Sequence, residues 1–298
     1  MISVIIPTFK NEELLVKNLQ TNLRFLLQCE VVVVNDDPDV SLKDKLSKFK
    51  DIILIENKKN LGFAASINIG TKNARGDYLM FLNNDVVLTN DDFKKTANMF
   101  VEDKDLFAVS FAQKEKNGML VGRNKFFWQK GLVFHSRDNQ SEKGISAWAE
   151  GGSCLVDKKK FFEIGCFDEI YTPFYWEDID LSFRAWKAGY KIIFTPEVIV
   201  LHQHETTIGK YFSKDIIKKI AFRNQFIFIW KNITDGSLIF QHFLLFIPNI
   251  LFLLFKKESQ VLAGLKEALS MIDIIRRKKE DQKKTFKLTD MSVFQFFL

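Results

Sequence analysis

The first third of the chain alternates short apolar runs with amphipathic stretches. The apolar runs, which suit buried strands, occupy residues 3–6, 30–34, 52–56 and 78–82. Patterns with helical spacing separate them at residues 12–27, 41–49 and 60–70. Strands that alternate with helices in this way predict βαβ units and an α/β fold with a mostly parallel sheet.

Polar residues stop these runs at what we expect to be one edge of the sheet. Right-handed crossovers place the strand ends with Thr8, Asp36 and Asp85 together, where open α/β sheets bind their ligands. A carboxylate at Asp85 can hold Mg²⁺ or Mn²⁺ if substrate phosphates complete the coordination shell. Taken alone, its Asn-Asn-Asp segment is better explained as a turn. Asp36 suits a turn and a hydrogen bond to a base or ribose about equally.

A glycine turn and an acidic helix start supply further candidates in the middle of the chain. Gly151 and Gly152 precede a strand expected at 154–156 and would let backbone N–H groups approach an anion or a sugar, although an ordinary turn is the better explanation of this segment by itself. A helix is expected to begin near Glu177. The acids in its first turn suit the helix dipole. Asp178, next to the indole of Trp176, also suits a general base beside a sugar platform.

Two of the four histidines follow a pair of strands expected at 191–194 and 198–201. The imidazole of His202 could join Asp85 in holding a metal, with His204 as second choice. A lone His-x-His favours a structural or surface role on spacing alone.

The C-terminal part is helical and strongly apolar. A helix is expected over 216–232, followed by the most apolar run of the protein at 237–255 and a basic helical segment at 260–284. Polar residues and a proline interrupt the apolar run, so a helix that lies in the membrane interface or packs on the protein is favoured over a span. The basic cluster at 276–279 suits an anionic leaflet and a solvated helix face equally well.

Composition narrows the class of protein. The chain has 298 residues, is 47% hydrophobic and has a net charge of +6, so it can bury a large core and suits anionic partners such as phosphates or a lipid surface. No nucleic-acid-binding signature occurs. Three cysteines without a CxxC pair, and a first segment unlike a signal peptide, predict a cytoplasmic protein with reduced thiols.

The order of these motifs resembles the family 2 inverting glycosyltransferases, and more narrowly their bacterial rhamnosyltransferase-type members. The matching segments are 3–9, 60–70, 81–85, 165–169, 176–181, 200–202, 223–224 and 230–232. The resemblance implies a GT-A fold, which is a Rossmann-like, mostly parallel sheet with flanking helices. It also implies a transferase domain at 1–232, with a nucleotide-sugar half at 1–112 and an acceptor half at 113–232. A helical extension at 233–298 follows as a candidate membrane contact.

The resemblance also implies roles for individual residues. Asp85 and His202 would bind Mn²⁺ or Mg²⁺, and Asp178 would be the catalytic base. The nucleotide-sugar residues would be Pro7, Thr8, Asp36, Asn60, Gly62, Asn68, Asn84 and Asp85. The acceptor residues would be Gly151, Gly152, Trp176 and Glu177.

The implied reaction moves a sugar from a UDP- or dTDP-linked donor to a hydroxyl of a glycan or lipid-linked acceptor, in cell-surface polysaccharide synthesis. The protein would act in the cytoplasm, with peripheral contact to the inner face of the membrane. Three departures from the family pattern lie at residues 35–38, at Asn83 in place of the first Asp of DxD, and at Ile67 in place of a donor-side arginine.

Two other functions compete with this interpretation. A nucleotidyltransferase would need a glycine-rich, basic loop after the first strand, and residues 7–11 (PTFKN) are not glycine-rich. A non-catalytic sugar-binding or scaffold subunit is disfavoured by the joint presence of Asp85, Asp178 and His202, although residues alone do not exclude it.

Overall fold

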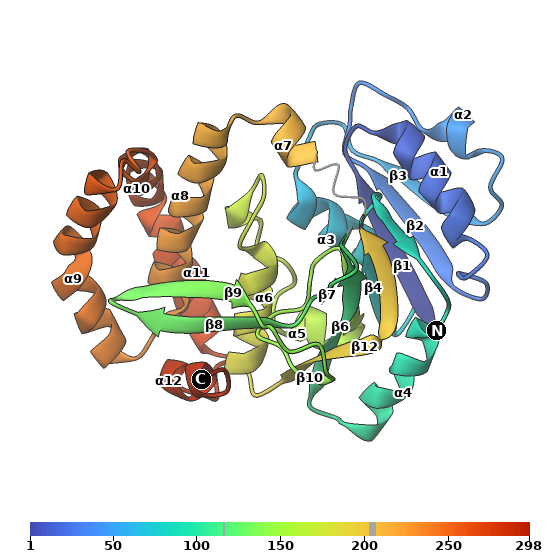
Figure 1. Ribbon diagram of the computed structural model, residues 1–298. Coiled ribbons are helices and arrows are strands. Elements are labelled where there is room, and N and C mark those ends of the chain that lie inside the picture. Colours follow the sequence, from blue (N-terminus) through green and yellow to red (C-terminus); the bar gives the residue numbers. More distant parts are fainter. Residues whose placement is uncertain (116, 203–206) are drawn as a thin grey trace.

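The four N-terminal strands form one parallel block. A computed structural model describes residues 1–115, 117–202 and 207–298 (Figure 1). In it the strands have the order β3-β2-β1-β4. Their bounds are β1 (Ile2–Thr8), β2 (Glu30–Asn35), β3 (Ile52–Glu56) and β4 (Tyr78–Leu82). They are joined by α1 (Glu12–Asn22), α2 (Lys43–Leu46) and α3 (Phe63–Asn73). The βαβ prediction is confirmed, although α1 and α2 are shorter than expected.

The remaining strands extend this block into a ten-stranded mixed sheet. Its main order is β10-β12-β6-β11-β4-β1-β2-β3, with β5 paired to β12 and β7 to β6. The additional strands are β5 (Val86–Leu88), β6 (Leu106–Lys114), β7 (Leu120–Val121), β10 (Gly144–Ile145), β11 (Ser153–Asp157) and β12 (Lys191–His202). β11 runs antiparallel to both of its neighbours, whereas β6 and β12 are parallel. More residues pair in parallel register than in antiparallel register, so the mixed sheet is mostly parallel, as predicted.

Alternate residues of the central strands face two separate cores. Ile5, Val32 and Val34 belong to a core on one face, together with Ile67 of α3. Val4, Ile6, Val31 and Val33 belong to the other, together with Leu15 and Leu19 of α1 and Phe93 and Phe100 of α4 (Phe93–Glu102). Both faces of the strands are covered, which explains why these runs are continuously apolar.

Several elements differ from the predicted ones. Two strands were expected at 191–194 and 198–201, but β12 is one strand in which an irregularity between Thr195 and Ile199 accommodates Pro196. The segment at 260–284 is two helices, α10 (Gln260–Ser270) and α11 (Ile272–Lys283). Short elements went unpredicted because their periodicity is too brief to detect: β5, β10, α5 (Lys158–Glu163), η1 (Glu169–Tyr171) and α12 (Asp290–Gln295).

The helical part of the chain packs on one end of the sheet domain (Figure 1). It comprises α6 (Glu177–Lys187), α7 (Thr207–Tyr211), α8 (Lys214–Asn232) and α9 (Gly236–Phe255), followed by α10–α12, beside a hairpin of β8 (Asn124–Gln129) and β9 (Leu132–Arg137). A buried ion pair of 2.5 Å joins Lys187 of α6 to Asp290 of α12. The C-terminal helix α12 therefore packs directly against α6.

Candidate active site

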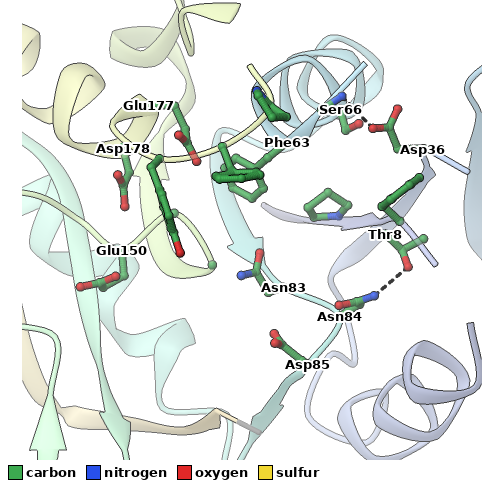
Figure 2. Close-up of a pocket in the computed structure, with 18 of the residues that line it drawn as sticks. Thr8, Asp36, Phe63, Ser66, Asn83, Asn84, Asp85, Glu150, Glu177 and Asp178 are labelled. Atoms are coloured by element: carbon green, nitrogen blue, oxygen red, sulfur yellow. Dashed lines mark hydrogen bonds between the residues drawn. The ribbon is translucent and has the colours of Figure 1, made fainter. Parts of the chain in front are cut away.

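A cavity of about 380 Å³ opens at the carboxyl ends of β1, β2 and β4. Twelve of the fourteen residues that the sequence nominated line it: Pro7, Thr8, Asp36, Asn60, Gly62, Asn84, Asp85, Gly151, Gly152, Glu177, Asp178 and His202. Figure 2 shows Thr8 and Asp36 on the right, Glu150, Glu177 and Asp178 on the left, and Asp85 at the bottom between them. The convergence expected from the strand ends is therefore present.

Asp85 and His202 meet at one end of this cavity. The unpredicted strand β5 pairs with β12 in a register that sets His202 opposite Val86, directly after Asp85. His202 Nε2 lies 3.3 Å from Asp85 Oδ2, and its Nδ1 lies 2.9 Å from Oε1 of Gln113. Burial alone would lower the pKa of His202, but the hydrogen bond and charge of Asp85 raise it above its ordinary value.

This pair suits a divalent cation. Asp85 Oδ1 is buried and accepts no hydrogen bond within the described part of the chain. A carboxylate oxygen and an imidazole nitrogen are suitable ligands for Mn²⁺. Among the described residues no group of three or more His, Cys, Asp or Glu side chains could hold a metal. A cation at this place would have two ligands from the protein, and oxygens of a bound substrate or water would supply the others.

Asp36 organises the start of α3. Its carboxylate accepts hydrogen bonds from the backbone N–H groups of Leu61 (2.9 Å) and Gly62 (2.8 Å) and from the Asn57 side chain (2.8 Å). Gly62 has φ +85°, a conformation that glycine adopts without strain. Both oxygens of Asp36 thus have partners in the protein, and the residue still lines the cavity.

Three carboxyl groups lie together across the cavity from Asp36, and the charge of one of them, Glu150, reaches His202. Burial raises the pKa of Asp178 to about 7, and the nearby charge of Glu150 adds to this shift. Burial, followed by the charge of Asp178, raises the pKa of Glu177 to about 8. The pKa of Glu150 is raised as well, mainly by burial. Gly151 lies beside them, and an added Cβ there would be in tight contact with the Phe63 ring, at 3.2 Å, and in ordinary contact with the Asp178 Cβ, at 3.5 Å.

The cavity wall is acidic apart from one histidine. Five acidic side chains line it, and the described residues of the wall include neither lysine nor arginine. The acids are Asp36, Asp85, Glu150, Glu177 and Asp178. An anionic ligand such as a diphosphate would be repelled here without a cation. The wall therefore favours a ligand that arrives with a bound metal.

Helix α8 holds the loop at 171–175, part of which lines the cavity. The Asn224 side-chain amide donates to the carbonyls of Tyr171 (3.2 Å), Phe174 (3.0 Å) and Tyr175 (2.8 Å). Arg223 donates to the carbonyl of Thr172 at 2.6 Å. Arg223 and Asn224 therefore hold the loop that leads into the acidic start of α6, although they follow it by about fifty residues in the sequence.

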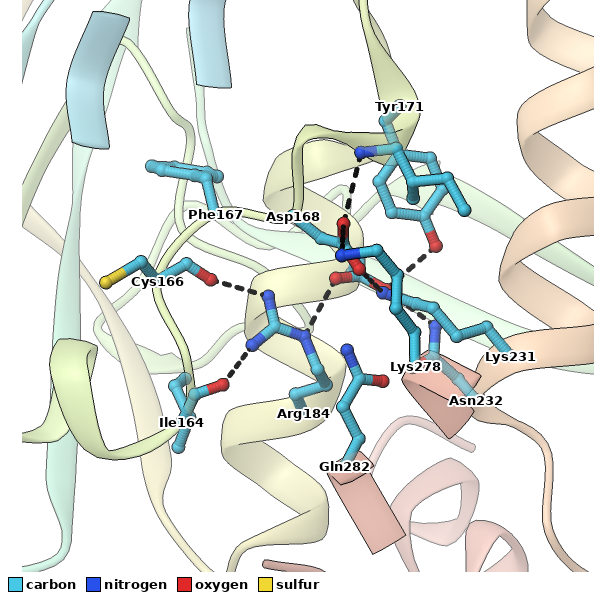
Figure 3. Close-up of polar contacts among 12 residues, drawn as sticks. Ile164, Cys166, Phe167, Asp168, Tyr171, Arg184, Lys231, Asn232, Lys278 and Gln282 are labelled. Carbon is cyan, nitrogen blue, oxygen red and sulfur yellow. Dashed lines mark hydrogen bonds and ion pairs between the residues drawn. The ribbon is translucent and has the colours of Figure 1, made fainter. Parts of the chain in front are cut away.

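A buried network of charges anchors the helix that contains Asp178 (Figure 3). Lys231 Nζ lies 2.7 Å from Asp168 Oδ2 and 2.7 Å from Asp180 Oδ1. Arg184 pairs with Asp180 at 2.8 Å, and Lys278 of α11 reaches Asp168 at 2.9 Å. Burial would raise the pKa of Asp168 and Asp180, but these cations hold it below the ordinary range.

Two nominated residues lie outside the cavity wall. Trp176, expected to support a sugar ring, is only 5% exposed, and its indole packs against His135 and Phe228 in the core. The burial of large apolar surface outweighs the platform role at this position. Asn68, expected to bind the nucleotide sugar, is buried, and its amide bonds with the backbone of Phe167. His204 lies outside the described residues.

The sequence missed other residues that line the cavity. Gln113 holds His202 and donates to Ser153 at 2.9 Å. Its position at the end of an apolar run is the same signal that identified Asp85. Tyr175, which is 42% exposed, lines the cavity where Trp176 was expected. Both aromatic side chains suit a sugar platform, and only the backbone direction at the start of α6 decides which of them faces the cavity.

Comparisons with known proteins find relatives of this chain in sequence and in fold. The model of glycosyl transferase family 2 matches residues 3–165, which is more than half of the chain. Poly-beta-1,6-N-acetyl-D-glucosamine synthase of Staphylococcus aureus is 26% identical over 171 residues. The match covers 56% of this chain and 41% of that protein, so this chain aligns with less than half of its relative's length.

Solved structures share the fold over nearly the whole chain. Staphylococcus aureus TarS, in complex with UDP-GlcNAc, is 14% identical with a TM-score of 0.55, covering 99% of this chain and 89% of that chain. The mannosyltransferase PcManGT from Pyrobaculum calidifontis, in complex with GDP-Man and Mn²⁺, is 15% identical with a TM-score of 0.57, covering 90% and 86%. At these identities the likeness shows the fold alone, which is GT-A.

Proposed function

The chain belongs to glycosyl transferase family 2, and from this premise we propose that it is a metal-dependent inverting enzyme. Its donor would be a UDP- or dTDP-linked sugar, and its acceptor a hydroxyl of a glycan or lipid-linked oligosaccharide in cell-surface polysaccharide synthesis. The observation that supports this most directly is the convergence of Asp85, Asp178 and His202 on one cavity, from segments far apart in the chain.

Asp85 and His202 would hold Mn²⁺ or Mg²⁺ against the donor diphosphate. A bound divalent cation supplies positive charge that stabilises a leaving diphosphate without a proton donor. Pro7, Thr8, Asn60, Gly62 and Asn84 would border the nucleotide, and Asp36 would shape this subsite through the backbone that it holds. Asn84 supports the arrangement, because its amide donates to Thr8 Oγ1 at 2.8 Å.

Asp178 would act as the base. Its carboxylate takes the proton of the acceptor hydroxyl, whose oxygen then bonds to the anomeric carbon as the bond from that carbon to the diphosphate oxygen breaks. A single displacement from the opposite face inverts the anomeric centre, the geometric logic of inverting glycosidases. A carboxyl group with a pKa of about 7 is well matched to proton abstraction near neutral pH.

Nucleotide release tests this function directly. Purified protein would be incubated with a panel of sugar nucleotides, Mn²⁺ and candidate glycan acceptors, and free nucleoside diphosphate would be measured. Acceptor-dependent release from one donor, with an inverted linkage in the product, is expected. Binding of a donor without any turnover across acceptors would instead indicate a non-catalytic nucleotide-sugar-binding subunit.

Donor binding is expected to require the metal. A true donor present at about 100 times its dissociation constant should stabilise the fold by about 2.7 kcal/mol with Mn²⁺. The stabilisation should disappear with EDTA, because the acidic cavity wall then faces the diphosphate unscreened. Thermal shift measures the stabilisation by the donor with Mn²⁺ and with EDTA. The Asp85→Asn variant should not be stabilised by the donor even with Mn²⁺ present. Equal stabilisation with and without metal would contradict the proposed role of Asp85.

The pH profile of kcat/KM should report Asp178. The base works deprotonated, so activity is expected to fall as the pH drops below about 7, where its carboxylate becomes protonated in the free enzyme. Glu150→Gln removes the neighbouring charge that raises this pKa, and should move the acid limb to lower pH. A limb that Glu150→Gln does not move would show that the charge of Glu150 does not raise the pKa of the titrating group.

A further inference from the structure

One face of α9 is a continuous exposed apolar surface. Its large side chains recur at helical spacing and are 58–82% exposed: Phe240, Phe243, Leu244, Ile247, Leu251, Phe252 and Phe255. In the described part of the chain, α9 is the one helix long and apolar enough to cross a membrane, and only 17% of its apolar window is buried. An exposed patch of this kind marks an interaction surface.

The opposite face of α9 is fastened to the protein by the polar residues that interrupt the run. The Trp128 indole donates to Gln241, and the Asn249 amide donates to the carbonyl of Lys130 at 2.8 Å. His242 lies between the carbonyl of Gly131 (2.7 Å) and the indole of Trp230 (3.0 Å). These polar groups have partners in the β8–β9 hairpin and α8, so they lie away from the exposed face, which stays apolar.

This attachment decides how the helix can meet a membrane. The 20 residues of α9 extend about 30 Å, which is enough to span a bilayer. Spanning would require Gln241, His242 and Asn249 to lose their partners or the hairpin to enter the hydrocarbon, and either is costly. A helix docked along one side and apolar along the other suits the plane of the interface instead.

Lysines border the exposed face. No charged residue occurs between Gly236 and Phe255, and Lys256 and Lys257 are exposed directly after them. Lys130 is exposed at the tip of the hairpin, beside Asn249. Asp235 lies at the N-terminal end of the helix, so the positive charge is at its C-terminal end and at the hairpin tip, where it is complementary to an anionic lipid surface.

We propose that the exposed face of α9 binds the surface of an anionic bilayer, with the helix lying in the interface plane and the domain outside the membrane. The contact is independent of the transferase chemistry, because the strip and the cavity share no residue.

Vesicle sedimentation tests the proposal. The full chain would be incubated with vesicles of phosphatidylcholine, with and without phosphatidylglycerol, and the bound fraction measured. The triple variant Phe243→Ser/Ile247→Ser/Leu251→Ser should lower the partition coefficient more than tenfold on both lipids. Lys256→Gln/Lys257→Gln should lower it about fivefold per lysine on anionic vesicles and little on neutral ones. The control Leu27→Ser/Val101→Ser/Met119→Ser changes exposed apolar residues elsewhere and should bind like the parent.

Further measurements separate the other occupants of this surface. Alkaline carbonate should release the protein from cell membranes, and resistance to extraction would show a spanning helix and overturn the proposal. Ultracentrifugation without lipid should give the same mass for the parent and the triple variant. A dimer that the triple variant abolishes would assign the face to a second copy. Failure to bind protein-free vesicles, while binding native membranes, would assign it to a membrane protein.

Discussion

Asp178→Asn is expected to lower kcat by about 10²–10⁴-fold while donor binding stays unchanged. The amide keeps the size of the side chain and its place in the first turn of α6, but it cannot take the acceptor proton. The fold should survive, because Asp178 is surrounded by other acids whose repulsion the substitution relieves. Its loss of activity would therefore be chemical and not structural. Turnover with the identified donor and acceptor measures kcat, and thermal shift with donor and Mn²⁺ measures binding.

Glu177→Gln is the matched control for that experiment. Glu177 precedes the proposed base, lines the same cavity and has a raised pKa for the same reason. Its change to an amide keeps the size of the side chain and removes a second ionisable carboxyl group next to Asp178. We expect a much smaller loss of kcat for Glu177→Gln than for Asp178→Asn. The reverse order would move the base to Glu177, and full activity of Asp178→Asn would remove the base assignment.

Lys231→Ala is expected to destabilise the fold by about 3–5 kcal/mol, the cost of leaving buried charges without a partner. The ammonium of Lys231 is fully buried between Asp168 and Asp180. Without it, both carboxylates keep only part of their compensation, from Lys278 and Arg184. Urea denaturation of the apo protein, followed by circular dichroism, measures the change.

Lys278→Ala is the control for the buried charge. Its ammonium also contacts Asp168, at 2.9 Å, but its side chain is 40% exposed. Solvent screening should limit its effect to about 1 kcal/mol or less. Equal effects of the two substitutions would show that the network does not bury Lys231 as described. Because Asp180 lies in the first turn of α6, two residues after Asp178, we expect surviving Lys231→Ala protein also to lose activity.

Much of the site was predictable because its signals are local. Asp85 follows a buried run, and such a polar stop marks a strand end in any α/β sheet. The acids at the start of α6 and the glycines at 151–152 could also be recognised from neighbouring residues alone. Trp176 and Asn68 could not be judged locally. An indole suits a sugar platform and a core equally well, and only the packing of His135 and Phe228 around it places Trp176 in the core.

The C-terminal half shows the same division. The apolar run of α9 was evident, but its polar interruptions were ambiguous, because a sequence does not say which partner a glutamine or histidine will find. The β8–β9 hairpin supplies that partner. The ion pair between Asp168 and Lys231 could not be predicted from the sequence either. They are 63 residues apart, and no pattern in either segment announces their 2.7 Å contact.

By itself, the sequence determined the alternation of strands and helices, the cluster of polar strand ends and the apolar character of α9, because periodicity and polarity are properties of neighbouring residues. The tertiary structure alone decided that His202 faces Asp85, since a short strand, β5, pairs with the end of β12 and sets their register. It also decided which face of α9 is free. Contacts between distant segments depend on how the whole chain packs, and no local pattern contains that information.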